Sequence, residues 1–321
     1  MARQVTAIGA KPGRRITIDL GAGREVSCQT MKNDAIKPMG RRHFLASAAG
    51  LGALALAPGW NTPGAEPRPG RLKQGVCLGV FGKMPLDLDG KCREAARLGA
   101  LGVDLVGPDA FPILKKHGLV PTMIPGGSDI KKGINDKNNH AEIDKRMRAM
   151  IQAAAEAGAP NVIVMAGDRK GITDQEGLES SVLFLNNIKK HAEDSGVTLC
   201  LELLNSKVNH PGYMCDSTRW GVKVCQQVNS PRVKLLYDIY HMQIMEGDVI
   251  RTIRENIQYI GHFHTAGNPG RHEFDETQEL NYPAICKAIA DAGFKGYFSH
   301  EYSPTGEPLA TLDKMMRLCE V

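Results

Sequence analysis

The stretch that decides the fold is VKLLYDIYHM, residues 233–242. Its apolar run ends at Asp238, and His241 follows three residues later. A short run rich in apolar residues, here Val233, Leu235 and Leu236, with a polar side chain where it stops is typical of a buried parallel strand. An acid at the end of a strand is also typical of a turn or a helix cap, so this stretch alone identifies no site.

The same pattern recurs in three other short apolar runs. Glu202 lies near the end of LCLELLN, His264 lies in YIGHFHTAG, and Glu301 lies in GYFSHEYSP. Four strand-like runs that each deliver a potential metal ligand favour one shared site over four unrelated caps.

The body of the chain alternates β-rich runs with segments that have apolar residues at helical spacing. Eight such units within residues 71–321 predict an α/β fold, a (β/α)8 TIM barrel, in one catalytic domain. The competing architecture, a doubly wound open sheet, usually has a Gly-rich phosphate turn after its first strand, and GVFGKMPLD is not such a turn. The predicted strands are 75–81, 103–107, 119–124, 161–167, 197–205, 233–239, 259–266 and 296–302, and the predicted helices are 87–99, 110–117, 140–158, 177–195, 216–228, 247–257, 281–292 and 307–319.

In a barrel of parallel strands, the carboxyl ends of all strands meet at one mouth. The four candidate ligands are separated by 36, 26 and 37 residues, which is about one strand–helix repeat each time. Three carboxylates and one imidazole suit Mn²⁺ or Mg²⁺ better than Co²⁺ or Zn²⁺. The sequence therefore predicts a metal site formed by Glu202, Asp238, His264 and Glu301.

Residues 39–70 read as a leader. A twin-arginine pair, Arg41 and Arg42, precedes the apolar run 44–57, and these fourteen residues are fewer than the roughly 20 that span a bilayer. A charged pair before a short apolar run is typical of a twin-arginine export signal, here followed by a Pro/Gly linker. We expect export to the periplasm with no stable membrane span after signal removal, and a cytoplasmic protein where the signal is not used.

The segment 1–38 before this leader resembles no signal, and translation from Met31 or Met39 is the alternative to a longer chain. Residues 1–70 hold ten Lys/Arg and four Asp/Glu, whereas the whole chain holds 40 and 35, so the body is nearly neutral. A nearly neutral body has no basic field that would recruit nucleic acid. The eight cysteines show neither CxxC pairs nor zinc-finger spacing, and we expect no structural disulfide.

Several motifs together resemble the hydroxypyruvate isomerase family, which belongs to the xylose isomerase-like barrels along with the ketose 3-epimerases. They are LELLNSKVNHPGYMCD, YDIYHMQIMEGD, GHFHTAGNPGRHE, ELNYP and HEYSP, and the likeness runs from about residue 75 to 305. The resemblance implies two catalytic glutamates, which fall on Glu202 and Glu301. Two departures accompany it: His264 stands where bacterial hydroxypyruvate isomerases carry Gln, and VDLVGPDAF lacks the acid–aromatic pair common at the end of the second strand.

The chemistry that these residues would support is proton transfer next to a carbonyl. A divalent ion stabilises the enediolate, and two carboxylates remove and return the proton. Arg271 would hold a substrate carboxylate or terminal hydroxyl through its planar fork, and His241 would hydrogen-bond the reacting oxygen. His210 is expected to line the pocket, His262 to lie inside the barrel, and His300 to be structural.

The expected partner is thus a small hydroxy-carbonyl compound or sugar, as in conversion of hydroxypyruvate to tartronate semialdehyde. A ketose 3-epimerase or a keto-polyol dehydratase uses the same proton abstraction and remains an alternative. An abasic-site endonuclease needs further histidines on the second and third strands, which VDLVG and LVPTMI do not supply. A non-catalytic periplasmic sugar-binding protein is the remaining class, and a homo-oligomer is one state that the sequence allows.

Overall fold

The structure is a computed structural model that describes residue 68 and residues 70–321. The segment 1–38 and the predicted twin-arginine signal, with its apolar run 44–57, therefore lie outside the described residues. Within the described part of the chain, no helix is long and apolar enough to cross a membrane.

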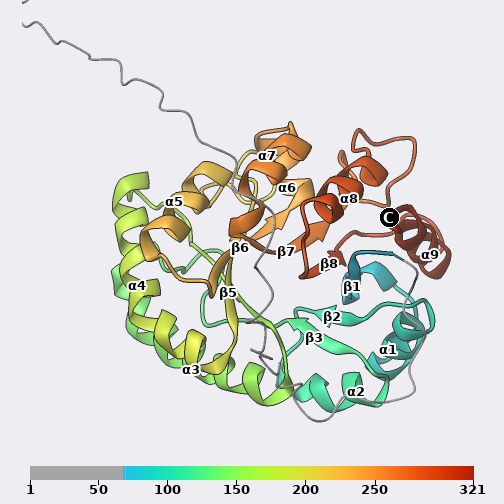
Figure 1. Cartoon of the computed structure of the whole chain (residues 1–321), viewed down its shortest axis with the longest axis horizontal. Helices are drawn as coiled ribbons and strands as arrows, with labels where there is room; N and C mark the ends of the chain where they lie inside the picture. Colours follow the sequence, from blue (N-terminus) through green and yellow to red (C-terminus); the bar gives the residue numbers. More distant parts are fainter. Residues whose placement is uncertain (1–67, 69) are drawn as a thin grey trace, which may run out of the picture. The chain divides into compact units, whose positions relative to one another are not determined.

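Eight parallel strands form the centre of the fold, as predicted (Figure 1). Their order is β3-β2-β1-β8-β7-β6-β5-β4, and the two outer strands meet through a parallel bridge between Ile124 and Val162, which nearly closes the barrel. The (β/α)8 prediction is confirmed. The strands are β1 Lys73–Cys77, β2 Gly102–Asp104, β3 Val120–Met123, β4 Asn161–Val164, β5 Thr198–Leu203, β6 Val233–Asp238, β7 Ile260–Thr265 and β8 Tyr297–His300.

Helices surround the strands on the outside of the barrel (Figure 1). Most begin and end within a few residues of the predicted limits. They are α1 Leu88–Arg97, α2 Phe111–Lys116, α3 His140–Ala157, α4 Asp174–Ser195, α5 Thr218–Val228, α6 Ile239–Met245, α7 Val249–Asn256, α8 Tyr282–Asp291 and α9 Pro308–Leu318, with 3-10 turns η1 Leu78–Phe81, η2 Pro108–Ala110, η3 Lys137–Asn139 and η4 Ile257–Tyr259.

One helix was not predicted. The helix expected over 247–257 is α7, and a separate helix, α6, precedes it and starts directly at the end of β6. The Asp238 side chain accepts a hydrogen bond from the His241 amide and so caps α6. Gly247 and Asp248 have φ values of 64° and 45°, and this left-handed backbone ends one helix before α7 begins.

Side-chain alternation along the strands produces two apolar cores. The larger core lies between the strands and the helices, whereas a small core fills the barrel interior with Met123, Ile163, Cys200 and Leu236. Glu202 and Asp238 follow Cys200 and Leu236 by two residues, so they point to the same side of their strands one layer nearer the mouth. Glu202 and Asp238 therefore rest on an apolar floor, whereas the layer below His264 holds the buried His262. All seven described cysteines are buried and free.

His300 is buried and bonds to Gln74 and Thr265, and this environment predicts an acid sensitivity of the fold. Its ring nitrogens lie 2.9 Å from Gln74 Oε1 and 3.2 Å from Thr265 Oγ1. Burial, with a smaller contribution from the charge of Arg68, lowers the pKa of His300 to about 3. The folded state thus binds one proton fewer than the unfolded state between pH ~6.5 and ~3.

This proton difference stabilises the fold fully above pH ~6.5, and the contribution is lost as the pH falls toward ~3. We expect His300→Gln to lower stability at pH 8 while reducing the pH slope of the unfolding free energy below pH 6 by about 1.4 kcal/mol per pH unit. Urea titrations at pH 8, 6 and 5 measure this slope. An unchanged slope in the variant would show that His300 is not the proton acceptor.

Candidate metal centre

The four predicted metal ligands meet at the mouth of the barrel. Glu202 lies on β5, Asp238 ends β6, His264 lies on β7, and Glu301 directly follows β8. One ligand atom from each residue lies within 4.8 Å of the others, and three of the four side chains are buried. The fold therefore brings these four residues together, as their spacing in the sequence predicts.

The donor atoms fit a divalent cation. His264 Nδ1 lies 3.0 Å from Glu301 Oε2 and 3.7 Å from Glu202 Oε1. Both atoms are buried, and Nδ1 has no hydrogen-bond partner among the described residues. Three acids this close repel one another unless positive charge lies between them. Oxygen atoms with one imidazole nitrogen are the ligands that Mn²⁺ and Mg²⁺ accept.

The two glutamates have opposite electrostatic environments. Burial raises the pKa of Glu202, and the nearby charges of Glu301 and Asp238 raise it further. Burial also opposes ionisation of Glu301, but His264 and Arg271 outweigh it and lower the pKa of Glu301 to about 2. Two carboxyl groups whose pKa values are pushed apart are typical of an acid–base pair.

Arg271 extends from the loop after β7 into this cluster. Its Nη2 lies 2.8 Å from Glu301 Oε2 and 3.7 Å from Asp238 Oδ2. Burial alone would lower the pKa of Arg271, but the surrounding acids raise it, so the guanidinium stays charged. The guanidinium also lies over the ring of Tyr240 at 5.5 Å, which restricts its orientation. The residue itself has a φ of 58°, in the left-handed region.

His241 lies beside the cluster with a defined tautomer. Its Nδ1 accepts from the backbone amide of Asn205 at 3.2 Å, which leaves the proton on Nε2. Nε2 lies 3.7 Å from Asp238 Oδ2 and makes no hydrogen bond among the described residues. Burial lowers the pKa of His241 to about 4, so a neutral ring offers an N–H at the mouth. The His210 ring lies 5.3 Å from that of His241, consistent with its predicted place in the pocket.

The sequence analysis missed two residues of this region, Asp104 and Asn205. The second strand lacks the acid–aromatic pair but still brings an acid to this region, because Asp104 on β2 is buried and its Oδ2 lies 3.0 Å from His264 Nε2. Burial opposes the ionised form, but His262 and His264 hold the pKa of Asp104 well below its usual range. The sequence did contain a signal for Asp104, because it is an acid inside the apolar run VDLVG. The same pattern identified the candidate ligands on the other strands.

The fold and this donor set define the class of protein. The protein family described as "xylose isomerase-like TIM barrel" matches residues 94–319, so the chain belongs to that family. Solved structures show the same barrel fold. A protein titled AP endonuclease, family 2, from Brucella melitensis is 25% identical with a TM-score of 0.70, covering 77% of this chain and 98% of its own. A D-psicose 3-epimerase at 18% identity and a TM-score of 0.62, covering 77% and 96%, shows the same fold.

Relatives with similar sequences confirm the predicted resemblance to the hydroxypyruvate isomerase family. The chain is 31% identical over 167 residues to a human protein provisionally named hydroxypyruvate isomerase, covering 50% of this chain and 60% of the relative. It is 33% identical over 157 residues to the 2-oxo-tetronate isomerase of Cupriavidus necator, covering 48% and 59%. These alignments span about three fifths of the relatives. The 2-oxo-tetronate isomerase of Haemophilus influenzae is 29% identical over 254 residues, covering 73% and 94%.

Proposed function

We propose that this protein is a metal-dependent isomerase of a short 2-oxo acid that carries a hydroxyl group on the next carbon. Hydroxypyruvate and 2-oxo-tetronate, the compounds named for the relatives, share this arrangement, and both carry a carboxylate. The observation that carries the proposal is the cluster of Glu202, Asp238, His264 and Glu301 with the charged Arg271 at its edge. It offers a cation site, a proton acceptor and a carboxylate-binding group together.

The residues divide the reaction between them. Glu301, ionised at neutral pH, takes a proton from the hydroxyl-bearing carbon next to the carbonyl. Glu202, whose pKa is raised, returns a proton to the former carbonyl carbon, while the hydroxyl proton passes to the former carbonyl oxygen. The glutamates regain their starting states by exchange with solvent. His241 donates its Nε2–H to a reacting oxygen, and Arg271 pairs with the substrate carboxylate.

Glu202, Asp238, His264 and Glu301 would hold the divalent ion. When bound, it supplies positive charge to the substrate oxygens as the proton leaves carbon. The apolar floor formed by Leu236 and its neighbours limits access of water from below, and this strengthens each charge interaction in the site.

The test is a substrate panel on protein reconstituted with Mn²⁺. We expect hydroxypyruvate or a 2-oxo-tetronate to be converted faster than neutral ketoses or keto-inositols. Arg271→Lys is expected to raise KM for the acids by about 10-fold or more, because Lys keeps the charge but loses the planar fork. Preferred turnover of a neutral ketose at its third carbon, with KM unaffected by Arg271→Lys, would instead identify a 3-epimerase.

An endonuclease function is not supported, although one similar structure carries that title. Among the described residues, the possible metal clusters are the four-residue group and a second group of Cys77, Asp104 and His264. Neither includes a histidine from β2 or β3, and the body beyond residue 70 has no excess of positive charge.

A further inference from the structure

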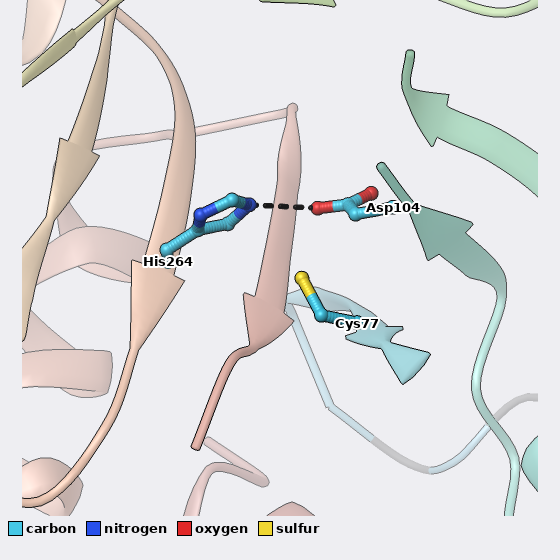
Figure 2. Close-up of side chains that lie close together, drawn as sticks. All are labelled: Cys77, Asp104 and His264. Carbon is cyan, nitrogen blue, oxygen red and sulfur yellow. Dashed lines mark hydrogen bonds and ion pairs between the residues drawn. The ribbon is translucent and has the colours of Figure 1, made fainter. Parts of the chain in front are cut away.

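We propose that Asp104 is a positioning residue that fixes the orientation and tautomer of His264, so that Nδ1 faces the metal centre. This inference rests on the proposed metal site and adds to it a residue from the opposite side of the imidazole. Figure 2 shows the arrangement, with Asp104 on β2 and His264 on β7 joined across the barrel interior.

The two nitrogens of His264 have different neighbours. Nε2 lies 3.0 Å from Asp104 Oδ2, whereas Nδ1 faces Glu301 and Glu202. An ionised carboxylate can only accept, so the proton of a neutral ring must lie on Nε2. The lone pair then lies on Nδ1, directed at the acids. A carboxylate behind a metal-bound histidine orients the ring and increases its basicity.

Asp104 is itself held firmly. Its Oδ1 accepts a hydrogen bond from the Thr122 hydroxyl, and its Oδ2 lies 2.6 Å from His262 Nε2. The side chains of Asp104, His262 and His264 are fully buried. The rings of His262 and His264 lie edge to face at 5.2 Å, so His262 packs against the ring that Asp104 orients. A buried carboxylate with several partners is costly to displace, as a fixed support requires.

Cys77 lies close to Asp104, and this suggests a second role for Asp104 as a metal ligand. The experiment must distinguish that role from the positioning of His264. Its Sγ lies within 4.8 Å of a carboxylate oxygen of Asp104 and a ring nitrogen of His264 (Figure 2). These three residues could ligate a thiophilic ion directly. Both carboxylate oxygens of Asp104 already have donors, the Thr122 hydroxyl at Oδ1 and the rings of His262 and His264 at Oδ2. The geometry therefore favours Asp104 as a support.

The experiment is calorimetric titration of metal-free full-length protein with Mn²⁺. Asp104→Leu and Asp104→Asn remove the carboxylate, and we expect each to weaken Mn²⁺ binding about 10- to 100-fold. Thr122→Val is the matched control, because it removes another partner of Asp104 and leaves His262 and His264 in place. It should change the affinity by less than about 3-fold. Asp104→Asn keeps the side-chain shape and serves where Asp104→Leu does not fold.

Nitrogen-15 NMR of the Zn²⁺-loaded protein provides a second measurement. In the wild type, the His264 ring should carry its proton on Nε2, and in Asp104→Asn this signal should shift or broaden. Unchanged Mn²⁺ affinity and an unchanged His264 signal would overturn the inference. A thiolate-to-Cd²⁺ absorption band that disappears in Cys77→Ser would also overturn it, because Asp104 would then belong to a ligand set.

The inference and the proposed function can fail separately. Wild-type protein that binds Mn²⁺ but isomerises no 2-oxo acid contradicts the proposed function and leaves the role of Asp104 supported by the affinity series. Wild-type protein that binds no Mn²⁺ and no Zn²⁺ overturns both.

Discussion

Glu301→Gln is expected to lower kcat for isomerisation about 10²- to 10⁴-fold, the range for loss of a general base. Gln keeps the size of the side chain but cannot take the proton from carbon. Glu301 is the glutamate whose pKa is lowered to about 2, after His264 and Arg271 outweigh the effect of its burial. The variant also removes one candidate metal ligand, so its kcat must be measured at saturating Mn²⁺.

A matched control separates the loss of this carboxylate from a general effect of charge. Glu276 lies in the loop after β7 and is exposed, so Glu276→Gln makes the same chemical change away from the site. Its kcat should equal that of the wild type. Exchange of the substrate C–H hydrogen with D₂O should stop in Glu301→Gln and continue in Glu276→Gln. If Glu301→Gln retains more than about one tenth of the activity, another group removes the proton.

The barrel and the convergence of three acids and one imidazole could be predicted because they depend on local patterns. An apolar run followed by a ligand at its end predicts both a buried strand and the direction in which the last side chain points. Parallel strands then force Glu202, Asp238, His264 and Glu301 to one mouth, whatever the loops between them do. No detail of packing was needed for that step.

Asp104 and Asn205 could not be predicted in the same way, because their roles depend on pairing across the barrel. Asp104 is 160 residues from His264 in the chain, and only the register of the whole barrel places it behind the imidazole. Asn205 contacts His241 Nδ1 through its backbone amide at 3.2 Å and through its side-chain amide at 2.6 Å, and no local pattern shows this pairing. The sequence pattern shows which side a strand residue faces, but not which nitrogen of a distant histidine it contacts.

The separate helix α6 was missed for a related reason. Asp238 was assigned to the metal site from its place at the strand end, but the same carboxylate also caps α6 by accepting from the His241 amide. The two readings of an acid at a strand end, a helix cap and a metal ligand, are both compatible with this position, because a carboxylate has two oxygens. Oδ1 bonds the His241 amide, and Oδ2 faces Arg271 and His241 Nε2.

Removal of the metal is expected to abolish activity, and Asp238→Asn separates metal binding from helix capping. Chelation followed by dialysis should lower kcat/KM by about 10³-fold or more, and added Mn²⁺ or Mg²⁺ should restore it. In Asp238→Asn the amide oxygen can still cap α6, since Asn caps helices about as well as Asp. The ion, however, loses a charged ligand, so Mn²⁺ affinity should fall about 10- to 100-fold while thermal stability of the metal-free protein changes little.

The control for this series is Asp248→Asn, which alters an exposed acid at the start of α7 that makes no side-chain cap. It should leave Mn²⁺ affinity and activity unchanged. Full activity in chelated protein, confirmed free of metal by elemental analysis, would contradict the metal-dependent mechanism. The cluster of acids would then have to be neutralised by Arg271 and a protonated His264 alone. Those two groups carry two positive charges against three carboxylates, so one of the three acids would remain protonated. Glu202 is that acid, because its pKa is raised.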